Sequence, residues 1–167
     1  GDPRQGCGCG QYRRQQYWSR ISGPLLDRFD LQVPLRSQQP DQSSPRAPEA
    51  TRVVARRVEL ARERMQQRNP QGCCNARLTA AELQSCVRFS SDAESWWRDL
   101  QPEPPLSGRS RYRLLAVALS LADLAASPLL EPQHLAEALL FRSLERSVVR
   151  DGGLDPALTR GARIAGD

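Results

Sequence analysis

The feature that most constrains the fold is a polar, proline-punctuated stretch that divides the chain at residues 37–48. It contains three prolines and almost no apolar side chain. A stretch of this composition is typical of a linker between folded parts. We therefore expect a first piece over residues 1–36, the linker, a helical domain over residues 49–146, and a disordered tail over residues 147–167.

The region after the linker carries the signals of a helical bundle. Apolar residues recur at helical spacing, and the Ser/Thr-x-x-Glu pattern of the capping box occurs twice. A proline at a first-turn position introduces the last helix. The sequence therefore predicts a mainly α fold. The expected helices begin at Glu49, Thr79, Ser91, Arg109 and Pro132, and the last one runs to about Arg146.

In the first piece, Arg28 lies between two acids, Asp27 and Asp30. Gly23-Pro24 is expected to end the preceding helix, because proline cannot continue its hydrogen bonds. The alternating apolar residues over 31–35 then predict a short half-buried strand. Arg28 would stand at the junction of loop and strand, where it can reach outside its own subunit. The alternative is a surface arginine in two weak ion pairs.

Three arginines stand in the first turns of the helix that begins at Arg109, with no acid among them: Arg109, Arg111 and Arg113. Each cation opposes the helix macrodipole by roughly 0.3 to 1 kcal/mol, so the pattern indicates a bound anion. Arg109 and Arg113 are four residues apart and share a face. Both side chains could therefore approach the same phosphate.

The formal net charge is +5, and all 24 basic residues are arginine. Without lysine, the chain has neither a lysine nucleophile nor the lysine of a phosphate loop. The arginine-rich helix over residues 49–68 is the best candidate for contact with a nucleic-acid backbone, through Arg56, Arg57 and Arg64. The alternative is a solvated amphipathic helix in which acids such as Glu59 are local partners of the arginines.

The five cysteines do not form a complete metal site in this sequence. Cys7 and Cys9 could supply two ligands, but nothing nearby supplies the other two. We expect the cysteines to be structural or incidental. His134 is the only histidine, which excludes a histidine pair and indicates a packing or capping role.

Trp96 and Trp97 are adjacent, so they cannot both face one side of a helix. We expect one to pack in the core and the other to lie against the linker, another domain or solvent. No window approaches 18 continuous apolar residues, and the first residues do not show the charged, apolar and small-residue pattern of a signal peptide. We expect a soluble cytoplasmic protein that does not enter a membrane.

Two segments resemble one protein family. The run from Arg20 to Leu31, with Cys7-Gly-Cys9 before it, is similar to part of the magnesium-chelatase-like AAA+ ATPases of the ComM/YifB type. The run from Ser107 to Leu124, with Ser-x-Arg at its start and Ala-Asp-Leu at its end, resembles the sensor-two helix of that family. The resemblance implies the last piece of an αβα ATPase core, with one helix and one short strand, followed by a helical lid.

By this resemblance Arg28 matches the arginine finger, which reaches the γ-phosphate of ATP bound to the neighbouring subunit. Arg109, with Arg113, would contact the nucleotide of its own subunit and couple hydrolysis to movement of the lid. The family implies ATP and Mg²⁺ in the intact protein, a homo-oligomer in the form of a hexameric ring, and work on DNA in recombination or transformation. Where the family commonly has basic residues further along this helix, the chain has Ala116 and Leu119.

We expect the chain to be a fragment, since it opens at Gly1 and its only methionine is Met65. It has no Gly-rich phosphate loop and no acidic strand to hold magnesium. Alone, it is expected to be monomeric, to bind no cofactor and to hydrolyse no ATP.

Two other functions stay open. One is the ATPase subunit of magnesium chelatase, which serves tetrapyrrole and chlorophyll synthesis. That subunit shares Leu-Leu-Asp-Arg-Phe but usually lacks the preceding Ser-Gly-Pro, which this chain has at residues 22–24. The other is a free-standing helical nucleic-acid-binding module, with the helix over residues 49–68 as its contact surface.

Overall fold

The computed structural model of the chain describes residue 8 and residues 10–33, 49–100 and 106–142. The chain divides into two compact units. The N-terminal unit contains the described residues up to 33 together with Phe141 and Arg142, and the helical unit contains residues 49–140. Cys7, Cys9, the linker and the tail lie outside the described residues.

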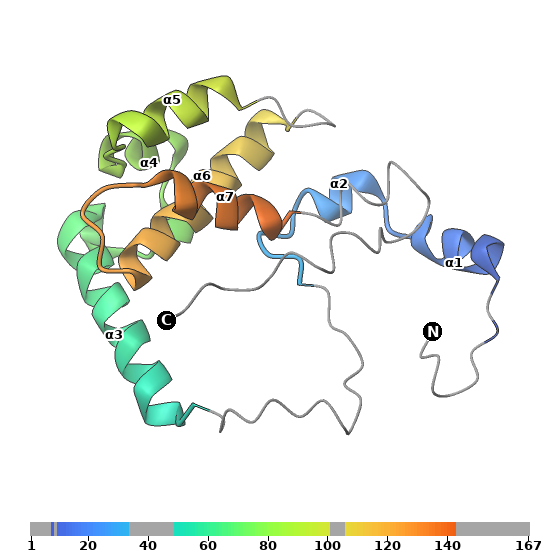
Figure 1. Cartoon of the computed structure of the whole chain (residues 1–167), viewed down its shortest axis with the longest axis horizontal. Coiled ribbons are helices and arrows are strands. Elements are labelled where there is room, and N and C mark those ends of the chain that lie inside the picture. Colours follow the sequence, from blue (N-terminus) through green and yellow to red (C-terminus); the bar gives the residue numbers. More distant parts are fainter. Residues whose placement is uncertain (1–7, 9, 34–48, 101–105, 143–167) are drawn as a thin grey trace. The chain divides into compact units, whose positions relative to one another are not determined.

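The N-terminal unit contains two helices, α1 (Gln11–Trp18) and the short α2 (Gly23–Leu26) (Figure 1). The expectation that the Gly-Pro pair ends the helix carrying Arg20 is wrong. Helix α1 ends at Trp18, and Gly23-Pro24 instead forms the first turn of α2. Proline suits that position because its fixed φ is already helical and its missing N–H would have no partner there.

The short strand expected over residues 31–35 is also wrong for the part that the structure describes. Residues 31–33 have no regular secondary structure, and Leu35 lies outside the described residues. Their exposure is the reverse of the predicted pattern, since Leu31 and Val33 are 54% and 56% exposed while Gln32 is 5% exposed. A backbone hydrogen bond joins this segment to the residues after α7, from the Gln32 N–H to the Phe141 carbonyl at 2.8 Å. A ladder needs a neighbouring strand, and the described residues offer none.

The helical unit confirms the mainly α prediction. It contains five α-helices in its described part, with two short 3₁₀ turns between the first and the second. Their bounds are α3 (Thr51–Arg68), η3 (Pro70–Gly72), η4 (Asn75–Arg77), α4 (Ala80–Cys86), α5 (Ser91–Asp99), α6 (Gly108–Leu124) and α7 (Pro132–Leu140).

Helix α6 is the centre of this unit, and it packs against α3, α4, α7 and η4 (Figure 1). Leu114 and Ala118 are fully buried. Ala116 and Leu119 are buried as well, at 8% and 4% exposure. The core therefore uses these two positions for apolar contact. Its other buried members include Leu78, Leu83, Ala93, Leu130, Leu135 and Ala138.

Helix α3 buries only part of the apolar stripe formed by Val54, Val58, Ala61 and Met65. Ala61 is 3% exposed and Met65 is half-buried, but Val54 and Val58 are each 38% exposed. In Figure 1 the N-terminal half of α3 extends beyond the other helices of the unit. The apolar spacing thus predicts the helix correctly, whereas burial depends on where α6 crosses it.

Local signals place most of the other helix ends. The capping box of α4 is present as predicted, because the Thr79 hydroxyl accepts from the Glu82 N–H while the Glu82 carboxylate accepts from the Thr79 N–H. In α5 the cap is Ser90 rather than the predicted Ser91. Ser90 donates its N–H to the Leu130 carbonyl at 3.1 Å, and this contact holds it in the extended conformation of an N-cap.

The last helix, α7, ends at Leu140 and not near Arg146. Phe141 and Arg142 follow it in a turn and make their hydrogen bonds within the N-terminal unit. His134 on α7 is 3% exposed, and its Nδ1 accepts from the Glu131 N–H at 3.0 Å. This confirms the packing and capping role predicted for it. Among the described residues, no helix is long and apolar enough to cross a membrane.

Candidate nucleotide-contacting arginines

Arg28 lies in a tight turn that extends α2. The Arg28 N–H donates to the Leu25 carbonyl at 3.0 Å, and the Phe29 N–H donates to the Leu26 carbonyl at 3.1 Å. Leu26 is buried, whereas the Arg28 side chain is exposed. Within the described residues, its guanidinium makes no hydrogen bond and no ion pair. The fold therefore fixes the backbone of Arg28 and leaves its side chain available.

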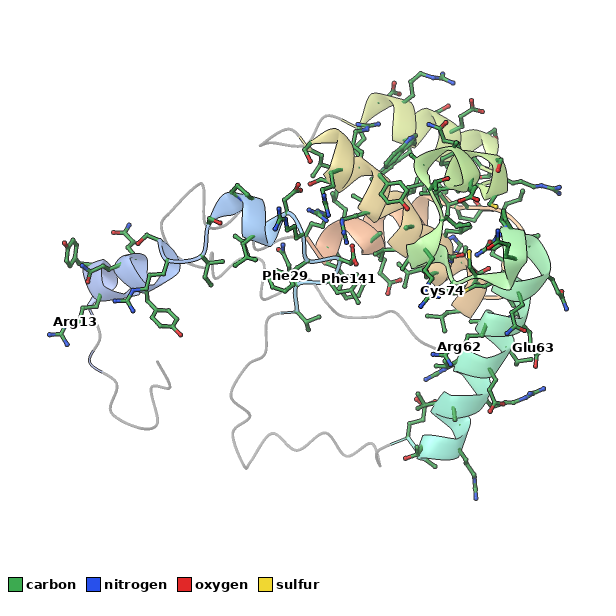
Figure 2. The ribbon with its side chains drawn as sticks, turned by 180° about the vertical axis from the view of Figure 1, so that it is seen from behind. Arg13, Phe29, Arg62, Glu63, Cys74 and Phe141 are labelled. Carbon is green, nitrogen blue, oxygen red and sulfur yellow. The ribbon has the colours of Figure 1, made fainter. Side chains whose placement is uncertain are left out.

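The two acids beside Arg28 do not hold it, contrary to the surface-arginine alternative. The Asp27 carboxylate instead accepts from Arg142, with Nη2 and Oδ1 3.1 Å apart. Arg142 Nη1 also donates to the Phe29 carbonyl at 3.4 Å. Phe29 and Phe141, which precedes Arg142, are both labelled in Figure 2. The residues on both sides of Arg28 are thus held by the same buried arginine.

Arg109 stands at the N-terminus of α6 in the helical unit. The N-cap is Ser107, whose Oγ accepts from the Ser110 N–H at 3.0 Å. Arg109 is exposed and, in the part of the chain that the structure describes, its side chain has no hydrogen-bonding partner. Arg113, one turn further along α6, is half-buried. The shared face predicted for these two arginines is present, with Arg109 the more accessible of the two.

Arg111, the arginine between them, is held by α5. Its guanidinium carbon lies 4.5 Å from the centroid of the Trp97 ring, and its Nη2 donates to the Trp97 carbonyl at 3.2 Å. The Trp97 ring also stacks on Phe89, with centroids 6.5 Å apart. Because Trp96 and Trp97 both pack partly buried against the core, the expectation that only one of them does so is wrong. A cation–π contact of this kind offsets the unfavourable macrodipole term for Arg111.

The three arginines proposed to contact nucleic acid all have partners within the protein. Arg56 pairs with Glu59 at 3.4 Å and with Glu63 at 3.8 Å, and Arg57 pairs with Glu49 at 2.8 Å. Arg64 Nη1 donates to the backbone carbonyl of Asp123 at 3.0 Å. Figure 2 labels Glu63 and its neighbour Arg62 on α3. Exposed ion pairs of this kind are weak, so the nucleic-acid contact stays a prediction for Arg56 and Arg57.

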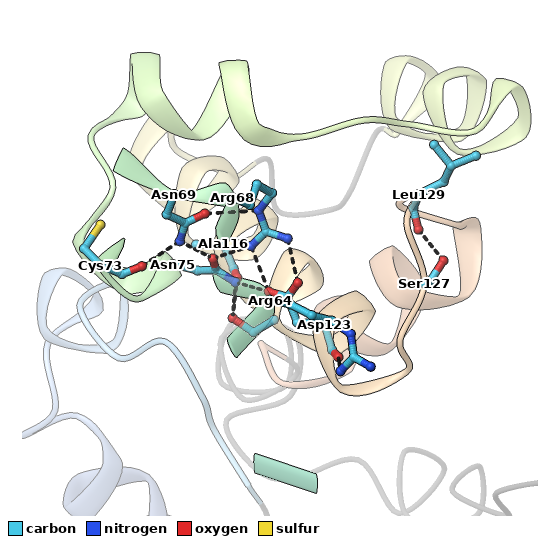
Figure 3. A network of polar contacts seen from close by, with 10 residues as sticks. Arg64, Arg68, Asn69, Cys73, Asn75, Ala116, Asp123, Ser127 and Leu129 are labelled. Atoms are coloured by element: carbon cyan, nitrogen blue, oxygen red, sulfur yellow. Dashed lines mark hydrogen bonds and ion pairs between the residues drawn. The ribbon is translucent and has the colours of Figure 1, made fainter. Parts of the chain in front are cut away.

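A polar network joins the C-terminal ends of α3 and α6 (Figure 3). Asp123, which is 1% exposed, accepts from both terminal nitrogens of Arg68, at 2.6 and 2.8 Å. Asn75 Nδ2 donates to the same carboxylate at 2.8 Å, and its own Oδ1 accepts from Arg68 and from Asn69. The buried charges are thus paired and hydrogen-bonded, which is the condition for tolerating them in a core. A cavity of about 620 Å³ borders this network, and its lining includes neither Arg109 nor Arg113.

Comparison with known proteins identifies the family. The C-terminal region of the magnesium chelatase subunit ChlI matches residues 48–142, and the preceding region of that subunit matches residues 1–43. Relatives include YifB of Salmonella typhimurium, which is 36% identical over 84% of this chain. A Mycobacterium tuberculosis protein is 39% identical over 84% of the chain, and the competence protein ComM of Haemophilus influenzae is 33% identical over 78%.

The chain belongs to the magnesium-chelatase-like family of the ComM/YifB type. It spans 28% of the length of the Salmonella YifB and 26% of that of ComM.

This member of the ComM/YifB family presents the predicted nucleotide residues in two separate places. Arg28 belongs to the N-terminal unit, whereas Arg109 and Arg113 belong to the helical unit. Cys7 and Cys9 lie outside the described residues, and those that are described contain no cluster of three or more metal-ligating side chains.

One residue of the Arg28 site, Arg142, was not predicted from the sequence. The signal available was weak, because Arg142 and Asp27 are 115 positions apart and no spacing rule connects them. Among relatives of the ComM/YifB type, joint variation at the two positions would be the signal to look for.

Proposed function

We propose that this chain is the arginine-finger segment and lid of an ATP-hydrolysing AAA+ protein. In this proposal Arg28 reaches the γ-phosphate of ATP bound to a neighbouring subunit, while Arg109, with Arg113, contacts the nucleotide of its own subunit. One observation carries it. At both family-matched positions the fold fixes the backbone and leaves an exposed guanidinium without a protein partner among the described residues.

The chemistry of arginine suits both roles. A guanidinium is planar, stays charged at any working pH, and can donate two parallel hydrogen bonds to phosphoryl oxygens. As negative charge develops on the transferred phosphoryl group, an arginine finger stabilises the transition state. At the start of α6, the helix dipole adds a further positive potential that favours a phosphate near Arg109.

The remaining parts of the nucleotide site belong to the whole protein. A phosphate-loop lysine is needed for the phosphates and an acidic side chain for Mg²⁺, and this chain has no lysine. The 167-residue chain alone should therefore hydrolyse no ATP. The proposal also requires a homo-oligomer, for which a hexameric ring is expected, because a finger that acts on a neighbour needs one.

Substitution in the whole protein tests the proposal. Arg28→Ala should lower ATP turnover by roughly a thousandfold while ATP binding to the altered subunit stays the same. Arg109→Ala should weaken nucleotide binding as well as turnover. Arg20→Ala and Arg77→Ala serve as matched controls, because both arginines are exposed and one lies in each unit. Full turnover by Arg28→Ala would contradict the proposal.

Mixed rings test whether the finger acts between subunits. Subunits with Arg28→Ala are mixed with subunits that lack the phosphate-loop lysine, each inactive by itself. In a mixed ring, an intact nucleotide site can face an intact finger, so turnover should return in part. No recovery, with ring assembly verified, would mean that Arg28 does not act on the neighbouring nucleotide.

We propose further that the whole protein works on DNA during recombination or transformation. The support is the name of the Haemophilus influenzae relative, a competence protein, together with exposed arginines on α3. Titration with duplex DNA at two salt concentrations tests it, because phosphate contacts must weaken steeply with salt. A salt-independent affinity, or none at low salt, would remove DNA from the proposal.

A further inference from the structure

Arg142 is the most deeply buried cation in the described part of the chain. It is 1% exposed, and it pairs with Asp27, whose side chain is about one-quarter exposed. A buried charge is costly unless it is paired and hydrogen-bonded. The residues that pair with Arg142 are therefore held in place, because moving them away would leave its buried charge without a partner.

Those contacts fall on both sides of Arg28. Arg142 Nη2 lies 3.1 Å from Asp27 Oδ1, and Arg142 Nη1 lies 3.4 Å from the carbonyl oxygen of Phe29. One planar guanidinium thus binds the residue before Arg28 and the residue after it. The two hydrogen bonds leave the Arg28 side chain exposed and set the orientation of its backbone.

Gln32 makes two further hydrogen bonds. Together with those of Arg142 they form a clamp on the turn that carries Arg28. Its side-chain Nε2 donates to the Leu26 carbonyl at 3.2 Å, and its backbone N–H donates to the Phe141 carbonyl at 2.8 Å. These two hydrogen bonds explain why Gln32, a polar residue, is only 5% exposed while its apolar neighbours are exposed. The segment from Leu26 to Gln32 is therefore joined to Phe141 and Arg142 by three hydrogen bonds, at Asp27, Phe29 and Gln32.

We propose that Arg142 is a positioning residue for Arg28. Its guanidinium holds the backbone of this turn through the residues on both sides of Arg28. The Phe141 carbonyl, beside it in the chain, holds the end of the same segment through Gln32. The inference rests on the proposed function of Arg28.

The test uses the whole protein and the variant Arg142→Gln, which keeps a hydrogen-bonding side chain but removes the charge. We expect kcat for ATP to fall about 10-fold to 100-fold while KM changes by less than about twofold, because the finger acts on the transition state. Arg142→Lys should recover little of this loss, since an ammonium cannot span the carboxylate and the carbonyl. A loss confined to KM would overturn the proposal.

A double variant separates positioning from general destabilisation. If Arg142 acts through Arg28, then Arg28→Ala with Arg142→Gln should be no slower than Arg28→Ala alone. Losses that multiply would show an independent role and overturn the proposal. The exposed Arg20→Gln is the matched control and should leave kcat unchanged.

Hydrogen exchange supplies a readout that does not depend on activity. Arg142→Gln should speed exchange in a peptide covering residues 25–33 and leave a peptide from the α6 core, residues 114–122, unchanged. Unchanged exchange at 25–33 would overturn the clamp. If Arg28→Ala keeps full turnover, the proposed function fails, and the exchange result alone then decides whether Arg142 fixes this turn.

Discussion

Arg28 and Arg109 are both exposed, but the chain holds them by different means. Arg109 lies two residues after its N-cap, Ser107, on a helix that runs through the core of its unit. Arg28 lies on a short turn whose shape depends on Arg142, a residue more than a hundred positions away in sequence. Arg109 is therefore positioned by residues close to it in sequence, whereas Arg28 is positioned by a residue far from it in sequence.

This difference has a consequence for mechanism. The backbone at the start of a well-packed helix moves only when the helix moves, so Arg109 has a rigid base. A turn tied by a few hydrogen bonds can change at lower free-energy cost. We therefore expect the backbone that carries Arg109 to be the stiffer of the two and the turn that carries Arg28 to be the more adjustable.

The largest effect is expected at the far end of α6, where the base of Arg109 is anchored. Asp123→Ala removes the carboxylate that accepts from Arg68 and Asn75, leaving their donors without a counter-charge. Since Arg68 keeps some solvent contact, we expect a loss of about 3 kcal/mol in the free energy of unfolding, at the low end for a broken buried pair. Chemical denaturation followed by circular dichroism measures it.

The control for Asp123→Ala is Glu137→Ala, which removes an exposed carboxylate from α7. It should change the free energy of unfolding by less than about 0.5 kcal/mol. Equal losses in the two variants would mean that the network does not anchor α6. The claim that Arg109 has a rigid base would then be wrong.

The sequence predicts the parts of this molecule that depend on neighbours. The capping box at Thr79, the long central helix and the roles of His134 follow from residues within one or two turns, and all are present. The helical spacing of apolar residues also predicts the mainly α fold class, because this spacing does not depend on which partner each helix packs against.

What the sequence could not predict depends on distant partners. Residues 31–33 have the alternation of a strand, but Gln32 donates hydrogen bonds to the Leu26 and Phe141 carbonyls and is buried. Arg68 is one of many arginines on α3, and only the fold brings it to Asp123. Likewise, the acids beside Arg28 suggest local ion pairs, whereas Asp27 pairs with Arg142.

The local cap of the Arg109 site should have a smaller effect than the network. Ser107→Ala removes the hydroxyl that accepts from the Ser110 N–H and should cost about 1 kcal/mol of stability. Ser95→Ala, at an exposed position within α5, should cost nothing, because alanine is the better helix former. A loss from Ser107→Ala as large as that from Asp123→Ala would remove the distinction between local and distant support.

The smallest effect belongs to the capping box of α4, the most local device in the chain, and it appears only with pH. The Thr79 N–H and hydroxyl donate to the Glu82 carboxylate and hold the pKa of Glu82 below its ordinary value of 4.5. The ionised carboxylate therefore stabilises α4 above that pH, and its contribution is lost as the pH falls through the lowered pKa. Glu82→Gln should remove this part of the acid dependence, so wild type and variant should converge in stability between about pH 5 and about pH 3. Denaturation curves at both pH values measure it, with Glu137→Gln as the exposed control. A difference between wild type and Glu82→Gln that grows as the pH falls would contradict the assignment and show that Glu82 is held by something beyond its own helix start.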